Sequence, residues 1–275
     1  MRLRPSLVIP ILAVALAACS SGSASPSAVP ASSAPSAAAA GELQVYAAAS
    51  LKAVLAKVKT AYEAANPGTT LTVSTDSSSA LETKIEQGAP ADVFLSADTK
   101  NPQTLVDRSL AAGSVVKFAG NLLTVIVPTA NPKGIRTPAD LATPGVKIIA
   151  CADGVPIQRY TLTLLGNLAK VSGYPADYAA RETANVVSHE DNVGAIVTKV
   201  GLGEGDAGIV YVTDARTSDK VTTVAIPADS NVPAAYGGVA VKASMRAGAA
   251  SSFLTWLEGT DGQAILATFG FLPPS

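Results

Sequence analysis

The chain has 275 residues, of which 48% are hydrophobic and 15% are charged, and its formal net charge at pH 7 is −1. A nearly neutral sequence without a basic block excludes a nucleic-acid partner and a broad anionic surface as partner. Its two cysteines, Cys19 and Cys151, exclude a framework of disulfide bonds.

The first nineteen residues are predicted to be a lipoprotein signal peptide. Arg2 and Arg4 give a positive start, and an apolar stretch over residues 7–18 is too short to span a bilayer permanently. Small residues directly before Cys19 resemble the lipobox at which bacterial lipoproteins are cleaved and acylated. We therefore expect lipidation of Cys19; a plain signal peptide with a chance cysteine is the alternative.

Residues 20–40 are nearly all Ser, Ala, Gly and Pro and carry no charge. Such a segment buries too little surface to offset the entropy of ordering, so we expect a flexible tether. Removing Arg2 and Arg4 from the 20 basic residues leaves 18 against 21 acidic ones, a net charge of −3. The sequence thus predicts an extracytoplasmic domain that a lipid anchors to the cell membrane.

From residue 43 onward, apolar strands alternate with amphipathic helices, which predicts an α/β fold with a mostly parallel sheet. Strands are expected at residues 43–47, 71–75, 92–96, 122–127, 146–150, 184–188, 208–212, 221–226 and 239–241. Helices are expected at residues 50–65, 81–87, 138–142, 157–171, 191–200 and 249–269. This order suits two lobes with a cleft between them, with a final segment that could return to the first lobe.

Hydroxyl residues stand where helices begin after successive strands. Ser50 follows the first predicted strand, and Ser77, Ser78 and Ser79 follow the second. A helix start presents unpaired N–H groups and about half a positive charge, so it can bind an anion without a cationic side chain. The alternative is that these serines are ordinary helix caps.

Four segments resemble the ModA family, the molybdate-binding proteins of ABC importers. They are Val45-Tyr46-Ala47-Ala48-Ala49-Ser50-Leu51, the Ser77-Ser78-Ser79 turn, Gln87-Gly88-Ala89-Pro90-Ala91-Asp92-Val93-Phe94 and Gly208-Ile209-Val210-Tyr211. The likeness runs from Leu43 to Phe271. It implies the type II periplasmic-binding-protein fold, an α/β fold whose two lobes enclose a ligand cleft and are joined by a hinge of two strands. The crossings would lie near 122–127 and 226–228, with lobe 1 at 41–123 plus 228–275 and lobe 2 at 124–227.

The resemblance also implies a function. The protein would capture molybdate or tungstate and deliver it to the membrane permease of an ABC importer, as a monomer, without catalysis and without a cofactor. The ligand-binding residues carried over from the family are Ser50, Ser78, Ile157, Asn192 and Tyr211, which would reach the metal only through the oxyanion oxygens. Ile157 and Asn192 would act through backbone N–H groups. Ile157 and Gln158 stand where the family commonly has a small residue and glycine, which leaves the contacting amide there open.

Selectivity would come from cavity size and donor number, which favour molybdate and tungstate over smaller sulfate and over protonated phosphate. A receptor of the same fold for sulfate, phosphate or an iron chelate is the closest rival. A receptor for carboxylates would want an arginine aimed at the cleft, and Arg159 is the only basic residue near a proposed contact. A purely structural lipoprotein is the third interpretation.

The other motifs in the sequence give little support for an enzyme, a metal site or a dinucleotide site. A serine hydrolase is improbable because His189 is the only histidine and no Gly-x-Ser-x-Gly elbow surrounds the serines. His189-Glu190-Asp191 is interpreted as a helix start rather than a metal site. Residues 203–208 match Gly-x-Gly-x-x-Gly but precede a strand, which favours a tight turn over a dinucleotide site. Cys151 is expected to be a buried structural thiol.

Overall fold

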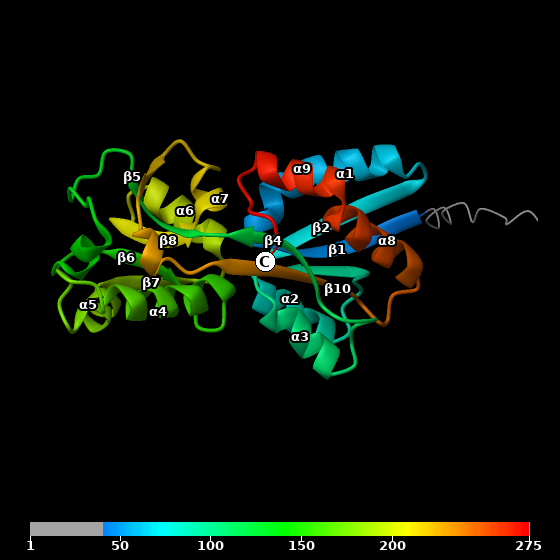
Figure 1. The fold of residues 1–275 in the computed structure, drawn as a ribbon, viewed down its shortest axis with the longest axis horizontal. Helices are drawn as coiled ribbons and strands as arrows, with labels where there is room; N and C mark the ends of the chain where they lie inside the picture. Colours follow the sequence, from blue (N-terminus) through cyan, green and yellow to red (C-terminus); the bar gives the residue numbers. More distant parts are fainter. Residues whose placement is uncertain (1–40, 275) are drawn as a thin grey trace, which may run out of the picture. The chain divides into compact units, whose positions relative to one another are not determined.

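The structure is a computed structural model that describes residues 41–274 (Figure 1). The predicted signal peptide, the predicted acylation site Cys19 and the predicted tether lie outside the described residues. Within the described part, no helix combines the length and the apolar character that crossing a membrane requires.

The elements follow one another as strands and helices in alternation. In chain order they are β1 (Gly41–Ala48), η1 (Ala49–Leu51), α1 (Lys52–Ala65), β2 (Thr69–Asp76), α2 (Ser78–Glu86), β3 (Val93–Ser96), α3 (Lys100–Asp107), β4 (Val116–Asn121), β5 (Leu123–Pro128), η2 (Pro138–Ala142), β6 (Ile148–Cys151), α4 (Pro156–Leu168), α5 (Tyr178–Ala184), β7 (Val186–Glu190), α6 (Val193–Gly201), β8 (Ala207–Tyr211), α7 (Val212–Ala215), β9 (Val221–Val224), η3 (Ala228–Ser230), β10 (Ala234–Ala240), α8 (Ala247–Glu258) and α9 (Thr260–Thr268).

The strands form two five-stranded sheets, in the orders β2-β1-β3-β10-β4 and β7-β6-β8-β5-β9. β1 pairs in parallel with β2 and β3, and β6 pairs in parallel with β7 and β8. β10 and β5 run antiparallel to their neighbours. The expectation of a mostly parallel sheet is therefore wrong: each sheet is mixed, because it includes a strand that adjoins a crossing between the sheets.

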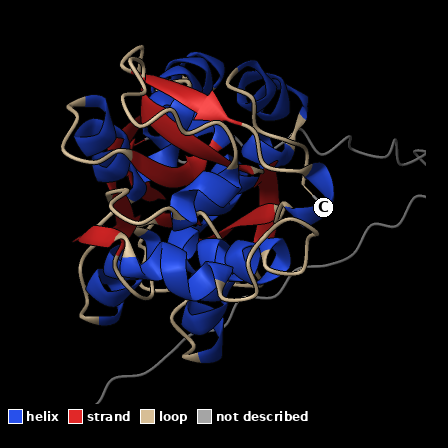
Figure 2. Ribbon diagram, turned by 90° about the vertical axis from the view of Figure 1, so that its left-hand side faces the viewer, coloured by secondary structure: helices blue, strands red, loops and turns tan. Residues whose placement is uncertain are grey.

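Helices cover both faces of each sheet, which explains why the central strands are apolar on both sides. In the first lobe α1, α8 and α9 lie on one face and α2 and α3 on the other, and in the second lobe α6 and α7 lie opposite α4 and α5 (Figure 1). Figure 2 shows the strands enclosed by helices. All four residues of β3 and all five of β8 are buried. This is the α/β fold of two lobes that the sequence predicted.

The last helices return to the first lobe, where α8 packs against α1 through an aromatic cluster. Tyr62 of α1 meets Phe253 and Trp256 of α8 edge to face, with ring centroids 4.9 and 5.3 Å apart. Such pairs add to the gain from burying the rings. The segment after β9 therefore returns to the lobe in which the described chain begins.

Two short connections join the sheets. β4 ends at Asn121 in the first sheet and β5 begins at Leu123 in the second, and the second connection runs from the end of β9 to the start of β10. The side chain of Asn231 ties them together, since its Oδ1 accepts from Leu123 N at 3.1 Å and its Nδ2 donates to Leu123 O at 2.9 Å. The residue at which each lobe ends remains a prediction.

Sequence patterns missed several elements. α3, β4, α5 and α7 were not expected, and β10 begins at Ala234 rather than at residue 239. Gly237-Gly238 inside β10 normally argues against a strand, whereas Pro102 lies in the first turn of α3, where a helix tolerates proline. His189 and Glu190 end β7 instead of opening a helix, so that interpretation was wrong.

Gly262 of α9 should not tolerate a side chain, because a Cβ there would lie 2.5 Å from Leu257 O and 2.6 Å from Leu257 Cα, both backbone atoms. We expect Gly262→Ala to lower the free energy of unfolding by about 1–3 kcal/mol through overpacking. The matched control is Gly166→Ala in α4, where a Cβ meets nothing within 4 Å. This substitution should stabilise the helix by about 0.5–1 kcal/mol, because alanine has the higher helix propensity. Urea unfolding measures both; equal effects would contradict the packing.

Candidate functional site

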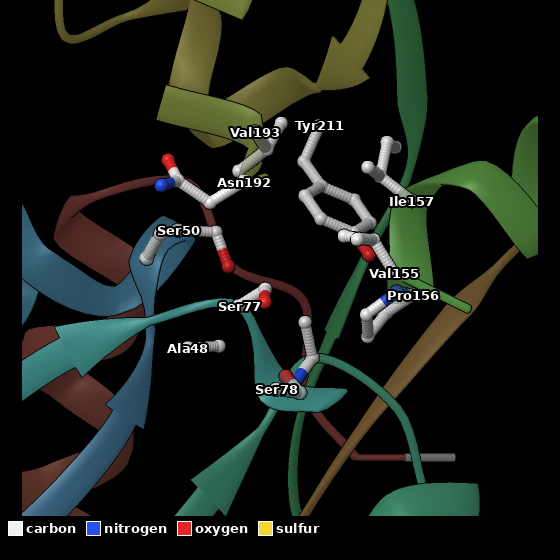
Figure 3. A pocket seen from close by; sticks show the side chains of 12 residues that line it. Ala48, Ser50, Ser77, Ser78, Val155, Pro156, Ile157, Asn192, Val193 and Tyr211 are labelled. Atoms are coloured by element: carbon white, nitrogen blue, oxygen red, sulfur yellow. The ribbon is translucent and has the colours of Figure 1, made fainter. Parts of the chain in front are cut away.

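A small cavity lies where the starts of η1, α2, α4 and α6 meet. Its lining comes from both lobes: Ala48, Ala49, Ser50, Ser77, Ser78, Ala97, Val155, Pro156, Ile157, Asn192, Val193 and Tyr211. Figure 3 shows the three serines on one side and Ile157, Asn192 and Tyr211 on the other. The starts of helices from both lobes thus surround this one cavity.

All five ligand-binding residues predicted from the sequence line this cavity. Ser50 and Ser78 come from the lobe of the first sheet, and Ile157, Asn192 and Tyr211 from the lobe of the second. Residues more than 150 positions apart in the chain are therefore brought together. That each of them contacts a ligand remains a prediction.

The serines after β2 divide into a cap and a free donor. Ser77 caps α2, since its Oγ accepts from Ala80 N at 3.4 Å. Ser78 Oγ accepts from Ala97 N at 3.0 Å. The oxygen of Ser78 is held by that amide, so its hydroxyl proton remains available to an acceptor in the cavity. The helix-cap alternative thus holds for Ser77 and fails for Ser78.

Ser50 is oriented by a chain of side chains. Ser50 Oγ lies 2.9 Å from Tyr236 Oη, which lies 3.4 Å from Asn121 Nδ2. An amide nitrogen only donates, so Tyr236 Oη accepts from Asn121, while either hydroxyl of the Ser50–Tyr236 pair can be the donor. With Tyr236 as the donor, the hydroxyl proton of Ser50 is free to point into the cavity that Ser50 lines. Ser50 itself lies inside η1 and caps no helix.

Two helix starts offer backbone donors. Pro156 has no N–H, and Gln158 N already donates to Val155 O at 3.0 Å, so Ile157 carries the first free amide of α4. In α6 the side chain of Asn192 caps Ala195 N at 3.3 Å, which leaves the amides before Ala195 without an intrahelical acceptor.

Tyr211 supplies a buried hydroxyl that lacks a partner. It is 1% exposed, and its Oη makes no hydrogen bond within the described residues. Burial raises the pKa of this phenol well above its usual value, so it stays protonated and can donate. An unsatisfied buried hydroxyl costs about 1–3 kcal/mol, which an acceptor in the cavity would offset.

The cavity holds donors but no charge. No lysine, arginine or carboxylate is among the residues that line it. Within residues 41–274 no three His, Cys, Asp or Glu side chains gather in a way that could hold a metal ion. Hydroxyl and amide donors without acceptors suit an anion with several oxygens.

Asp214 lies in α7, just after Tyr211, and is buried. Its carboxyl group accepts from the backbone N–H of Tyr211, while Oδ2 has no hydrogen-bond partner among residues 41–274. Burial raises the pKa of Asp214 to about 7, whereas the hydrogen bond from Tyr211 lowers it less. Below about pH 7, Asp214 is therefore mostly protonated and places no negative charge next to Tyr211.

The remaining motifs lie outside the cavity. Glu190 forms an ion pair with Lys199 at 2.7 Å. Cys151 is a buried free thiol, as expected, and burial raises its pKa. Gly203 has φ +78°, and the segment after it forms the turn that leads into β8.

Sequence reasoning missed the residues that orient the donors. Tyr236 and Asn121 were never singled out, and neither was Ala97, whose N–H holds Ser78. Tyr236 lies in the part of β10 that the sequence did not predict.

Comparison with known proteins agrees with this geometry. The family model described as bacterial extracellular solute-binding protein matches residues 43–272. The molybdate-binding protein ModA of Mycobacterium tuberculosis is 34% identical over 273 residues, covering 99% of this chain and 98% of the relative.

Two solved structures share the fold. The periplasmic molybdate-binding protein of Azotobacter vinelandii has a TM-score of 0.70 at 24% identity and covers 85% of this chain and 100% of its own. The sulfate-binding protein SubI of M. tuberculosis has a TM-score of 0.74 at 24% identity and covers 84% and 86%. At this identity these two likenesses establish the fold alone.

Asp214→Asn should change how stability depends on pH. The folded state binds the Asp214 proton more tightly than the unfolded chain, so wild type loses stability as pH rises from about 4 to about 7 and stays destabilised above that. Asn does not ionise, so we expect Asp214→Asn to be more stable than wild type by on the order of 2–4 kcal/mol at about pH 8, with a smaller difference at about pH 5. Urea unfolding at both pH values measures this, and a difference independent of pH would contradict it.

Proposed function

We propose the function from one premise: the chain belongs to the bacterial extracellular solute-binding proteins and, among them, to the ModA molybdate-binding proteins. It captures molybdate in the cavity between its lobes and delivers it to the membrane permease of an ABC importer. The observation that carries this proposal is the meeting of uncharged donors from four helix starts around one buried tyrosine hydroxyl that has no partner among the described residues.

The number of donors is sufficient for useful affinity. Hydrogen bonds to a charged group contribute about 1.5–3 kcal/mol each. Roughly six or seven of them, less the free energy of ordering the ligand and lobes, correspond to dissociation constants in the micromolar to nanomolar range. Since no cation lines the cavity, release of the anion does not require separating a full ion pair at the ligand.

The ligand is expected to be a large tetrahedral oxyanion. Donors held on two lobes fit one size of ion, so tungstate should bind as molybdate does, and smaller sulfate should lose contacts. A sulfate or phosphate receptor is the alternative within the same fold. The relationship to ModA at 34% identity favours molybdate over that alternative.

Delivery requires the protein to stay near the permease. We propose that acylation of Cys19 anchors the chain at the outer face of the cell membrane and that residues 20–40 act as the tether. The protein would work there as a monomer, and its role is binding rather than catalysis, in keeping with the relatives described as binding proteins.

Calorimetric titration of the purified domain with four sodium salts tests the proposal. Molybdate and tungstate should bind with similar affinity, and sulfate and phosphate should bind at least about tenfold more weakly because they match fewer donors. Equal affinity for all four would contradict the size argument. Absence of heat with every anion would favour the structural interpretation.

Ser78→Ala should weaken molybdate binding by about 1–3 kcal/mol through the loss of one charge-assisted hydrogen bond. The matched control is Ser79→Ala in the same helix turn, because Ser79 does not line the cavity. Titration of both variants gives the affinities, and thermal melting shows whether the loss of the Ala97 acceptor also affects stability. Equal affinities for Ser78→Ala and wild type would show that Ser78 makes no ligand contact.

A further inference from the structure

An ion pair joins the two lobes beside the cavity. Arg159 of α4 contacts Asp98 Oδ2, which follows β3 in the other lobe. A second nitrogen of the same guanidinium donates to Gly154 O, in the turn before α4. Arg159 therefore holds the turn that leads to the Ile157 amide and links it to the first lobe.

The carboxylate of Asp98 is fixed by its own lobe. Ser96 Oγ donates to Asp98 Oδ1 at 2.8 Å, and Asn101 N donates to the same oxygen at 3.0 Å. Asp98 is 5% exposed. Since one oxygen is held by these two donors, the other is presented to Arg159 in one orientation, which lowers the entropy lost on pairing.

The pair borders the cavity on both of its walls. Ala97, the residue before Asp98, lines the cavity, and so do Val155, Pro156 and Ile157 near Arg159. Another inter-lobe hydrogen bond by a side chain close to the site, from Asn121 to Thr213 at 2.8 Å, starts from the crossing segment itself. Asp98 and Arg159 lie outside both crossings, so separating the lobes about the hinge would pull them apart.

The ion pair with Asp98 also neutralises the positive charge of Arg159, so that this charge does not act on the ligand. Arg159 lies two positions after Ile157, one of the predicted contacts, and its side chain is 28% exposed. Because Asp98 neutralises it, the cavity keeps the uncharged lining described above.

We propose that Asp98 and Arg159 form a latch that closes the two lobes over the bound anion and sets its rate of release. This inference rests on the proposed function. An anion enters before the lobes close, so the latch forms after association and must break before dissociation. Loss of the latch therefore raises the dissociation rate constant and leaves the association rate constant unchanged.

The test is a chase of radiolabelled molybdate with excess unlabelled molybdate, together with equilibrium titration. Arg159→Gln should release molybdate about tenfold faster than wild type, the effect of losing one charge-assisted contact. The association rate constant should stay within about twofold, since the open form is unaffected. Arg159→Lys, which keeps the charge but loses the fork of donors, should fall between Arg159→Gln and wild type.

The matched control is Arg181→Gln, because Arg181 pairs with Asp177 within α5 and touches one lobe only. It should release molybdate as wild type does. The melting temperature of ligand-free Arg159→Gln should match that of ligand-free wild type; a large drop would make the role structural and overturn the latch.

Three further results of this experiment would overturn the latch, the proposed function or both. Unchanged release by Arg159→Gln, with wild type binding molybdate, overturns the latch and leaves the proposed function intact. A slower association with unchanged release overturns it too, because Arg159 would then act on capture. Wild type that binds no oxyanion overturns the proposed function and the latch with it. Should Arg159→Gln fail to fold, the release rate of Arg159→Lys decides.

Discussion

The first turn of a helix leaves N–H groups that no carbonyl of the same helix can accept. In this chain four such starts, those of η1, α2, α4 and α6, are placed around one cavity. Their amides and the hydroxyls beside them need acceptors, and the hydroxyl of Tyr211 is buried without one among the described residues. We propose that a bound anion accepts from these donors together. The folded chain thus presents unpaired hydrogen-bond donors to the cavity, and a ligand with several acceptor oxygens would pair with them.

The crossing connections make this arrangement possible. Each sheet sends the carboxyl ends of its parallel strands, and the helices that follow them, toward the cavity, and the antiparallel strands β5 and β10 adjoin the crossings. Asn121, at one crossing, bonds both Thr213 and Tyr236. Through Tyr236 this hinge residue orients the hydroxyl of Ser50. Lobe geometry and donor geometry are therefore connected in one hydrogen-bond chain.

Short-range patterns in the sequence predicted much of the fold and part of the site. Apolar runs followed by serine revealed β1, β2 and the positions of Ser50 and Ser78, because strand, turn and helix start are all short-range patterns. The resemblance to a known family supplied Ile157, Asn192 and Tyr211. Tyr236 and the pairing of Asp98 with Arg159 could not be found in this way, because each depends on contacts over 61 or more positions. Gly237 and Gly238 hid the start of β10, where tertiary packing overrides local preference.

The central claim is that uncharged donors at helix starts are sufficient to hold a doubly negative oxyanion. A crystal structure of the molybdate complex tests it most directly. We expect the ion inside the cavity, within hydrogen-bond distance of the hydroxyls of Ser50, Ser78 and Tyr211 and of amides that open α4 and α6. An ion held by a lysine or arginine side chain, or bound outside this cavity, would contradict the claim.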